Sequence, residues 1–486
     1  MSLQTAIERS ASPAGVAVAL ERLSEVVPGV QARLAADPKL RDAVFAVTGA
    51  SRSLTELLVS EPAALEVLAD LDTRPVLDDE EDGDLRRWKR LELLRIAARD
   101  LTGRDDLPIV GRALAQLADE VFQVAATRAG ADPGLAVIGM GKLGGRELNY
   151  SSDVDIMFVG DPRGHDRTAR AILDTVRTCF RVDVDLRPEG RDGPLVRTLE
   201  SYEAYWERWA HTWEFQALLK ARPVAGDAAL GAAFHERACA RVWERPFTLD
   251  DLRAIRSMKA RSEEELAKRG LTDREVKRGR GGIRDIEFSV QLLQLVHGRA
   301  DPELRSPTTL EALAEMGAHG YIDPSDARAL DAAYRLLRTV EHRLQLVHEQ
   351  QVHTLPAPGD HAGRDRLARV MGYRDTPEAT AGDLLDGFLR RQQAAVRSIH
   401  KHLFFRPLLD ALTATGGASL MSDEAVATRL EAFGFTEANR TRLALRELTK
   451  GLTRSSRLMQ QMLPLLLGWL SESPNPDLGL LGLRVL

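Results

Sequence analysis

The chain has 486 residues, a formal net charge of −6, 44% hydrophobic and 28% charged residues, and two cysteines. This length exceeds what one hydrophobic core holds, so we expect about two to four domains. The charge excludes a broadly basic nucleic-acid-binding protein, and two cysteines exclude a disulfide scaffold and suit a reducing cytoplasm. The sequence shows no secretory signal and no apolar run of the ~20 residues that a membrane span needs, so we expect a cytoplasmic protein without a nucleic-acid or membrane partner.

The predicted fold class is α+β and predominantly α-helical. Residues 1–128 are expected to be helical, because Ala, Leu, Glu and Arg dominate and apolar residues recur at helical spacing. Within them, the acidic stretch 78–84 is predicted to be an exposed loop, since runs of like charge are usually solvated. We expect three further regions: a small-sheet core at 129–230, a helical region packing on it at 231–355, and a helical bundle with a linker-like end at 356–486.

Residues 135–190 are the only part of the chain with convincing strand signals. Short apolar runs predict strands at 135–138, 154–159 and 181–186. Residues 166–180, between the last two, are predicted to be a helix. This order predicts a small mixed α/β sheet.

Helical patterns return after residue 196. Aromatic residues recur there mostly three or four positions apart, and we expect them to pack on the sheet rather than to stack on a ligand: Tyr202, Tyr205, Trp206, Trp209 and Trp213. Further helices are predicted within 250–300, 306–350, 380–405 and 422–470. The final stretch, 471–486, is broken by Pro and Gly and is predicted to be a linker.

The stretch 135–159 carries the most chemical information. A glycine-rich turn around Lys142 follows its first strand and contains Gly139, Gly141, Gly144 and Gly145. Asp153 and Asp155 come next, and residues two apart on a strand face the same side, roughly 6.5–7 Å from each other. Two carboxylates held in this way can share divalent metal ions, and the turn can offer backbone N–H groups to phosphate. The combination points to nucleotidyl or phosphoryl transfer.

The glycines also form Gly-x-Gly-x-x-Gly at 139–144, the pattern of a dinucleotide-binding turn. That pattern requires a helix directly after the glycines and an acidic residue about 20 positions further on. Here the glycines lead within a few residues to 149–152, which are poor helix-interior residues, and then to the two aspartates. We therefore disfavour a dinucleotide-dependent oxidoreductase, and the lack of GxxxxGK[ST] excludes a Walker-type loop.

A third carboxylate is expected on a neighbouring strand. In RVDVDLRPEG, Asp183, Asp185 and Arg187 alternate and would share one face of that strand. This face either completes a metal site or forms a structural ion pair with the arginine. Ser151 and Ser152, just before the first two aspartates, either donate to phosphate oxygens or shape the turn.

A second phosphate-binding segment is predicted at 276–288. Lys277, Arg278 and Arg280 lie among three glycines just before a predicted helix. Glycines with cations at a helix N-terminus form an anion site. The alternative is a flexible basic loop followed by ordinary acidic residues at the helix start.

Two resemblances follow from these motifs. Gly141-Lys142, followed after ten residues by Asp153-Val154-Asp155, resembles the nucleotidyltransferase signature of the polymerase-β-like superfamily, although Lys142 stands where that signature carries Gly or Ser. The longer strings GMGKLGGRELNYSSDVDIMF, RVDVDLRPEGRDGPL and KRGRGGIRDIEFSVQLLQLVHG resemble the glutamine synthetase adenylyltransferase/adenylyl-removing enzyme family, over at least residues 135–298. The resemblance implies a polymerase-β-like nucleotidyltransferase domain flanked by helical bundles, with its third carboxylate at Asp183.

The family resemblance also implies an activity. Family proteins carry a pair of such units: the N-terminal one removes AMP from adenylylated glutamine synthetase by phosphorolysis, giving ADP, and the C-terminal one adds AMP from ATP. The Gly-Met-Gly-Lys and Asn-Tyr-Ser-Ser details resemble the N-terminal unit, so we expect the deadenylylating half. The adenylylating activity and a regulatory module that docks a PII-type signal protein are the alternatives.

The same resemblance implies a site and its ligands. Asp153, Asp155 and Asp183 are expected to be catalytic and to hold Mg²⁺, as a pair of ions, with Mn²⁺ as the alternative. Glutamine synthetase is the expected protein substrate, orthophosphate, ADP and ATP are expected ligands, and glutamine is an expected effector. The residues expected to contact phosphate or nucleotide are Gly141, Lys142, Gly144, Gly145, Ser151, Ser152, Arg187, Lys277 and Arg280.

Overall fold

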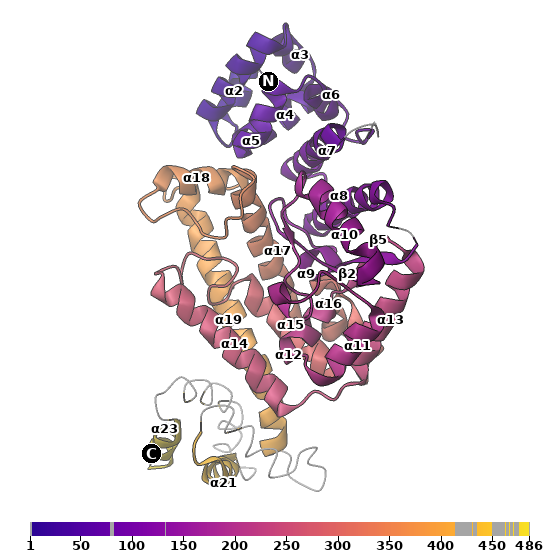
Figure 1. Ribbon diagram of the computed structural model, residues 1–486. Helices are drawn as coiled ribbons and strands as arrows, with labels where there is room; N and C mark the ends of the chain where they lie inside the picture. The colour runs from indigo at the N-terminus through magenta and orange to yellow at the C-terminus, as the bar shows by residue number, and fades with distance from the viewer. Residues whose placement is uncertain are drawn as a thin grey trace.

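The computed structural model is mostly α-helical, with one small mixed sheet in its described part, as the sequence predicts (Figure 1). It describes residues 2–77, 82–131, 133–413, 435–449 and 476–485, and the single residues 430, 462, 466 and 470. No helix among these residues combines the length and the apolar character of a membrane-spanning segment.

Within the described residues the sheet has five strands: β1 (Leu135–Gly139), β2 (Val154–Gly160), β3 (Val182–Asp183), β4 (Val196–Arg197) and β5 (Arg222–Gly226). β1 is antiparallel to β2 and β5, whereas β3 and β4 run parallel to β2. The strands predicted at 135–138 and 154–159 are confirmed. β4 and β5 were not predicted, because β4 has only two residues and β5 contains Pro and Gly, which are depleted in strands.

The strand predicted at 181–186 is wrong in its length. β3 ends at Asp183, whose Oδ1 accepts a hydrogen bond from the backbone N–H of Asp185 at 2.7 Å. This side-chain bond turns the chain out of the strand, and Pro188 follows without an N–H that could continue the ladder. Asp183, Asp185 and Arg187 therefore do not share one strand face.

The residues before β1 are helical, as predicted. They form α1 (Leu3–Glu8), α2 (Pro13–Val26), α3 (Val30–Ala36), α4 (Pro38–Ala50), α5 (Arg52–Ser60), α6 (Ala63–Ala69), α7 (Asp82–Leu101) and α8 (Leu107–Ala129). The predicted acidic loop is wrong for residues 82–84, which begin α7, and its residues 78–81 lie outside the described part of the chain. These helices share one hydrophobic core with the sheet, and the domain boundary at 128 stays a prediction.

The two faces of the sheet carry different helices, because successive residues of a strand point to opposite sides. On β1, Leu135 and Val137 pack into the core that contains α8 and α10 (Pro162–Arg177). Ala136 and Ile138 pack into the core that contains α11 (Leu199–Arg208), α12 (Thr212–Leu218) and α13 (Ala228–Glu244). α10 confirms the helix predicted at 166–180.

Part of the predicted aromatic face packs beneath the sheet. Tyr202 and Trp206 contact Phe234, with ring centroids 5.1 and 5.3 Å from that of Phe234. Trp209 and Trp213 are 71% and 39% exposed, so the prediction is wrong for these two. The break between α11 and α12 interrupts the helical spacing at this point.

The helices after the sheet build a third core. They are α15 (Ile283–His297), α16 (Thr309–Ala318), α17 (Pro324–Leu346), α18 (His361–Val370) and α19 (Ala381–Thr413). α14 (Leu249–Lys268) lies against α12, and its Ile255 packs into the core beneath the sheet. Loops interrupt the helical stretches predicted at 250–300 and 306–350, and α19 confirms the one at 380–405. α15, α17 and α19 lie side by side (Figure 1).

The end of the chain contains further helices. α21 (Ala438–Thr449) lies within the helical stretch predicted at 422–470, most of which falls outside the described residues. The linker predicted at 471–486 is wrong for residues 476–485, which form α23 (Pro476–Val485). Its proline stands at the first helical position, where the missing N–H is no loss. Short 3₁₀ helices occur at Gly190–Asp192 and Pro302–Arg305.

Candidate active site

The glycine turn lies directly against a carboxylate of β2. After β1 the chain forms α9 (Gly141–Gly144), a single helical turn. Gly141 has a φ of +52°, and a Cβ at this position would lie 2.5 Å from Oδ2 of Asp155. Glycine at this position is therefore what allows the turn to approach Asp155 so closely.

The last two glycines of the turn are needed for packing. A Cβ at Gly144 would overlap with the carbonyl oxygen of Lys220, and a Cβ at Gly145 would lie 2.9 Å from the carbonyl oxygen of Pro307. The turn is thus pressed against the segments that precede β5 and α16. Contact of these two glycines with phosphate stays a prediction.

The direction of the strands excludes the dinucleotide-binding alternative. In that fold, the strands before and after the glycines are parallel and are joined by a full helix. Here β1 and β2 are antiparallel, with Leu135 opposite Gly160, and α9 has only four residues.

Two of the predicted carboxylates stand side by side on neighbouring strands. Asp155 of β2 is the register partner of Asp183 of β3, and partners of this kind lie about 4.8 Å apart and point to the same face. Burial and, after it, the charge of Asp183 raise the pKa of Asp155 to about 6, while Lys142 and Lys277 act to lower it. A divalent cation bound by oxygen ligands would relieve the repulsion between the two carboxylates.

Asp153, the remaining predicted carboxylate, already has protein partners. Asp153 lies just before β2 and accepts hydrogen bonds from Arg181 Nε at 2.8 Å and from Gln351 Nε2 at 3.3 Å. In the part of the chain that the structure describes, no three His, Cys, Asp or Glu side chains gather closely enough to hold a metal ion. The Asp155–Asp183 pair is assembled, whereas Asp153 is held by the half-exposed Arg181 side chain, and its role in a metal site stays a prediction.

The loop after β3 uses its charged side chains for its own structure. Asp185 accepts a hydrogen bond from Arg191 Nε at 2.6 Å. Arg187 is 8% exposed and donates to the backbone carbonyls of Val184 and Gly193. Arg187 thus braces the loop, and its predicted contact with phosphate would require these bonds to break.

Two lysines converge on the carboxylate pair from different segments. Lys142 lies in α9 and Lys277 in the glycine loop before α15, and the charges of both act on Asp155. Burial and, after it, the charge of Lys277 lower the pKa of Lys142 to about 7. Neither ammonium group forms an ion pair with the described residues, so two cations beside the carboxylates are available to an anionic ligand.

Of the other residues predicted to contact phosphate, Arg280 and Ser151 have protein partners and Ser152 does not make a side-chain hydrogen bond with the described residues. Arg280 is 63% exposed and pairs with Glu263 of α14 at 3.4 Å. The hydroxyl of Ser151 donates to the backbone carbonyl of Glu349 at 2.9 Å. Ser152 makes no side-chain hydrogen bond within the described residues, which leaves its hydroxyl available to a ligand.

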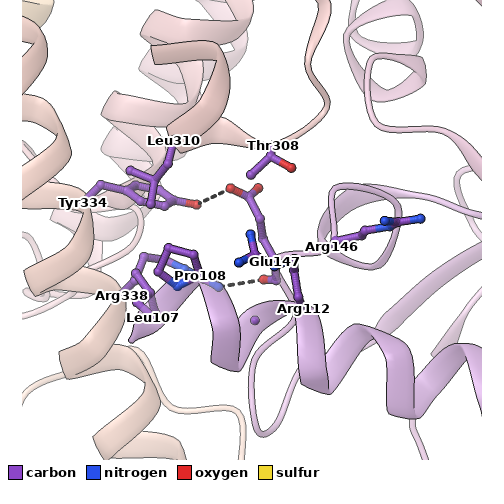
Figure 2. A pocket seen from close by; sticks show the side chains of 10 residues that line it. Leu107, Pro108, Arg112, Arg146, Glu147, Thr308, Leu310, Tyr334 and Arg338 are labelled. Atoms are coloured by element: carbon purple, nitrogen blue, oxygen red, sulfur yellow. Dashed lines mark hydrogen bonds between the residues drawn. The ribbon is translucent and has the colours of Figure 1, made fainter. Parts of the chain in front are cut away.

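A buried ionic network behind the glycine turn was not predicted. Glu147 is 7% exposed and pairs with Lys220 at 2.5 Å, and its backbone carbonyl accepts from Arg338 at 2.6 Å. Figure 2 shows Glu147, Arg338 and Tyr334 around a cavity of about 20 Å³, which has room for about one water molecule. Although burial opposes it, the charge of Lys220 holds the pKa of Glu287 below its usual range.

The sequence carries only a weak signal for this network. Arg338 and Glu341 lie three residues apart on α17, a spacing that is typical of ion pairs on an exposed helix surface. In the structure they pair at 2.8 Å and are 2% and 0% exposed. Their burial results from the packing of α17 against other elements, which spacing within one helix does not reveal.

These features define a class of protein. A small mixed sheet carries a carboxylate pair on adjacent strands, next to a glycine turn and two lysines that make no ion pair with the described residues. Carboxylates for metal ions and cations for phosphate are the groups that phosphoryl and nucleotidyl transfer require. The chain is a nucleotidyltransferase-like protein whose small sheet is surrounded by helices.

Comparison with known proteins gives the family. The family described as glutamate-ammonia ligase adenylyltransferase matches residues 20–237, and the family described as GlnD PII-uridylyltransferase matches residues 253–404. Proteins named bifunctional glutamine synthetase adenylyltransferase/adenylyl-removing enzyme are 40% identical to this chain in Streptomyces avermitilis and in Mycobacterium tuberculosis strain H37Rv. These matches cover 99% and 94% of this chain, and 52% and 49% of the relatives.

A protein of the same name from Corynebacterium efficiens is 41% identical over 83% of this chain and 40% of its own length. The identity extends over nearly the whole chain, and the chain belongs to the glutamate-ammonia ligase adenylyltransferase family. It spans about half the length of the curated relatives it matches.

Proposed function

We propose that the chain removes AMP from adenylylated glutamine synthetase by metal-dependent phosphorolysis, releasing ADP, in the regulation of nitrogen assimilation. The observation that carries the proposal is the Asp155–Asp183 pair beside Lys142 and Lys277, neither of which makes an ion pair in the described part of the chain. The names of the relatives supply the substrate. The resemblance of the Gly-Met-Gly-Lys and Asn-Tyr-Ser-Ser segments to the N-terminal unit supplies the direction of the reaction.

The site residues divide the chemistry between them. Asp155, Asp183 and Asp153 would together hold Mg²⁺ or Mn²⁺. The metal ion would neutralise the negative charge around the reacting phosphorus. Lys142 and Lys277 would hold the attacking orthophosphate and the AMP phosphate near each other. An orthophosphate oxygen forms a bond to the AMP phosphorus while the bond from phosphorus to the tyrosine oxygen breaks. The tyrosine oxygen keeps the electron pair and takes up a proton, and ADP leaves.

The geometry narrows the set of predicted ligand contacts. We retain Gly141, which touches Asp155, and Ser152, whose hydroxyl is available. We do not assign ligand contacts to Ser151, Arg187 and Arg280, because the structure bonds them elsewhere.

The second candidate is the reverse type of activity, ATP-dependent adenylylation of glutamine synthetase. It is favoured by the names of the relatives, which include both activities, and it would use the same carboxylates. The match of residues 253–404 to the PII-uridylyltransferase family supports a PII-type signal protein as a partner, and glutamine is the expected effector. A purely regulatory module is disfavoured, since all three expected carboxylates are present.

The test uses the purified chain, adenylylated glutamine synthetase and Mg²⁺, with and without orthophosphate, and measures ADP. We expect ADP only when orthophosphate is present, and none from Asp155→Asn, whose thermal unfolding should stay cooperative. AMP transfer from ATP onto unmodified synthetase, in place of ADP formation, would reverse the assigned direction. Neither product would favour the regulatory module.

A further inference from the structure

A cavity lined by basic side chains lies outside the carboxylate pair, and neither Asp155 nor Asp183 lines it. It has a volume of about 320 Å³, at the lower end of the roughly 300–1,000 Å³ of ligand clefts. Its lining comes from α7, from the C-terminal end of α10 and from the segment after α17. The lining residues that carry the argument are Arg86, Lys89, Arg90, Thr178, His348 and Glu349.

Lys89 is the main sign that this cavity has a ligand. Its side chain is 8% exposed, and no carboxylate lies within ion-pair distance of it among the described residues. The ammonium lies 5.0 Å from the centre of the Phe180 ring, and burial lowers its pKa. Because Lys89 makes no ion pair with the described residues, its ammonium group is available to an anion in the cavity, while the charge of Glu349 acts to raise its pKa.

The side chains around Lys89 carry more positive than negative charge. Arg86 and Arg90 line the same cavity, and His348 adds a further nitrogen. The one carboxylate of the lining, Glu349, accepts a hydrogen bond from the Ser53 hydroxyl at 2.7 Å. The lining therefore carries at least three basic side chains against one acid and offers donors to an oxyanion.

We propose that this cavity binds a phosphate group, either as inorganic phosphate or as the phosphate of a small nucleotide. Arginine and lysine side chains, of which Arg86, Lys89 and Arg90 line this cavity, are the donors that a phosphate group takes. The site is separate from the carboxylate pair. It does not depend on which reaction that pair catalyses.

The bound group would lie beside the segment that holds Asp153. Glu349 has a φ of +50°, which is uncommon for a residue with a side chain, and its carbonyl accepts from the Ser151 hydroxyl. Gln351, two residues on, donates to Asp153. Occupation of the cavity thus adds contacts to the segment that positions Asp153.

The test measures binding of sulfate, orthophosphate and AMP to the whole chain by titration calorimetry, without metal ions and in an Asp155→Asn background, where turnover does not interfere. Arg86→Gln, at an exposed side chain, and Lys89→Met should each weaken binding roughly tenfold or more. The matched control is Arg87→Gln, because Arg87 is the next residue on α7 and pairs with Glu61 instead.

The outcomes separate the possible sources of the phosphate group. Tighter binding of AMP than of orthophosphate, lost in both cavity variants, supports a nucleotide, and equal binding supports inorganic phosphate. If Arg86→Gln binds all three anions as tightly as Arg87→Gln does, the proposal is overturned, whether or not Lys89→Met folds. Binding that survives in both cavity variants would belong to another site, such as Lys142 and Lys277.

Discussion

At Lys142, two effects act against each other. Lys142 supplies a cation for phosphate. Burial and the charge of the neighbouring Lys277, however, make the charged form of Lys142 unfavourable and lower its pKa to about 7. We expect Lys142→Met to raise the apparent KM for orthophosphate roughly tenfold or more, the loss of one charge-assisted hydrogen bond, without lowering thermal stability. Steady-state kinetics of ADP formation would measure this change.

Arg280→Met is the matched control for that experiment. It removes a cation from the same predicted phosphate segment as Lys277, but Arg280 is exposed and pairs with Glu263. We expect its KM for orthophosphate to stay near that of the unaltered chain. An equal rise in both variants would show that Lys142 acts only through the general field of the protein.

Asp119, which pairs with Arg222 beside the glycine turn, gives a pH-dependent prediction. Burial raises its pKa to about 6 despite its ion pair with Arg222 at 2.8 Å. Because the folded pKa lies above the unfolded one, the stability it contributes is present below about pH 4 and is lost as pH rises through about 6. Asp119→Asn should therefore gain about 1–2 kcal/mol relative to the unaltered chain between pH 5 and pH 7.5.

Urea unfolding at the two pH values would measure the effect of Asp119→Asn. Arg222 keeps acceptors in the variant, because it also donates to the carbonyls of Leu143 and Gly144. A stability difference between the two proteins that does not change with pH would contradict the assigned pKa.

At the scale of single residues, spacing was informative where the chain is regular. The Asp-Val-Asp spacing singled out Asp155, which β2 carries, whereas Asp153 lies just before the strand and accepts from Arg181. Asp185 and Arg187 were misplaced on one strand face with Asp183, because the hydrogen bond from the Asp185 N–H to Asp183 ends the strand. Whether a charged side chain is already bonded, as Arg187 is, depends on tertiary contacts.

Among the elements, the glycine turn depends most on close packing. A Cβ at Gly144 would overlap with the carbonyl oxygen of Lys220, which is backbone and has little freedom to move. We expect Gly144→Ala to lower the free energy of unfolding by about 1–3 kcal/mol, a cost typical of overpacking, and to reduce turnover because the turn carries Lys142. Urea unfolding and ADP formation would test both effects.

Gly164 provides the control for the glycine turn. It lies in α10 at an exposed position, and nothing stands within 4 Å of the place of its Cβ. Gly164→Ala should raise stability by about 0.4–1 kcal/mol, because alanine restricts the unfolded chain. Equal effects of the two substitutions would rule out the close contact at Gly144.

Elements with long apolar runs were predicted well, and short or polar ones were not. β1 is a continuous apolar run, β2 is apolar except for Asp155, and α10 and α19 are long helices. β3 and β4 have two residues each, so they exist only through pairing with β2, a non-local contact. α23 was mistaken for a linker because Pro476 was taken as a break, whereas it opens the helix.

On the scale of the whole molecule, buried charges connect the sheet region to the helices that follow it. Glu147, after the glycine turn, pairs with Lys220, before β5, and accepts at its backbone from Arg338 of α17. We expect Glu147→Gln to lower the free energy of unfolding by about 3–5 kcal/mol, because it removes the carboxylate that pairs with the buried Lys220 at 2.5 Å. Urea unfolding would measure the loss.

An exposed ion pair serves as the reference for this substitution. Glu66→Gln breaks the pair with Arg33, whose two side chains are 66% and 40% exposed, and should cost only about 0–1 kcal/mol. Similar losses in the two variants would contradict the role of the buried pair. The network itself could not be predicted, since its members come from segments about 70 to 190 residues apart.

The central claim is that Asp155 and Asp183 together form the metal site of the transfer reaction. The most direct measurement compares Mn²⁺ binding and ADP formation in Asp183→Asn and in Asp185→Asn, two carboxylates that stand two residues apart. The account predicts that Asp183→Asn loses both, whereas Asp185→Asn, whose carboxylate pairs with Arg191, keeps both. Metal binding and turnover retained by Asp183→Asn and lost in Asp185→Asn would contradict it.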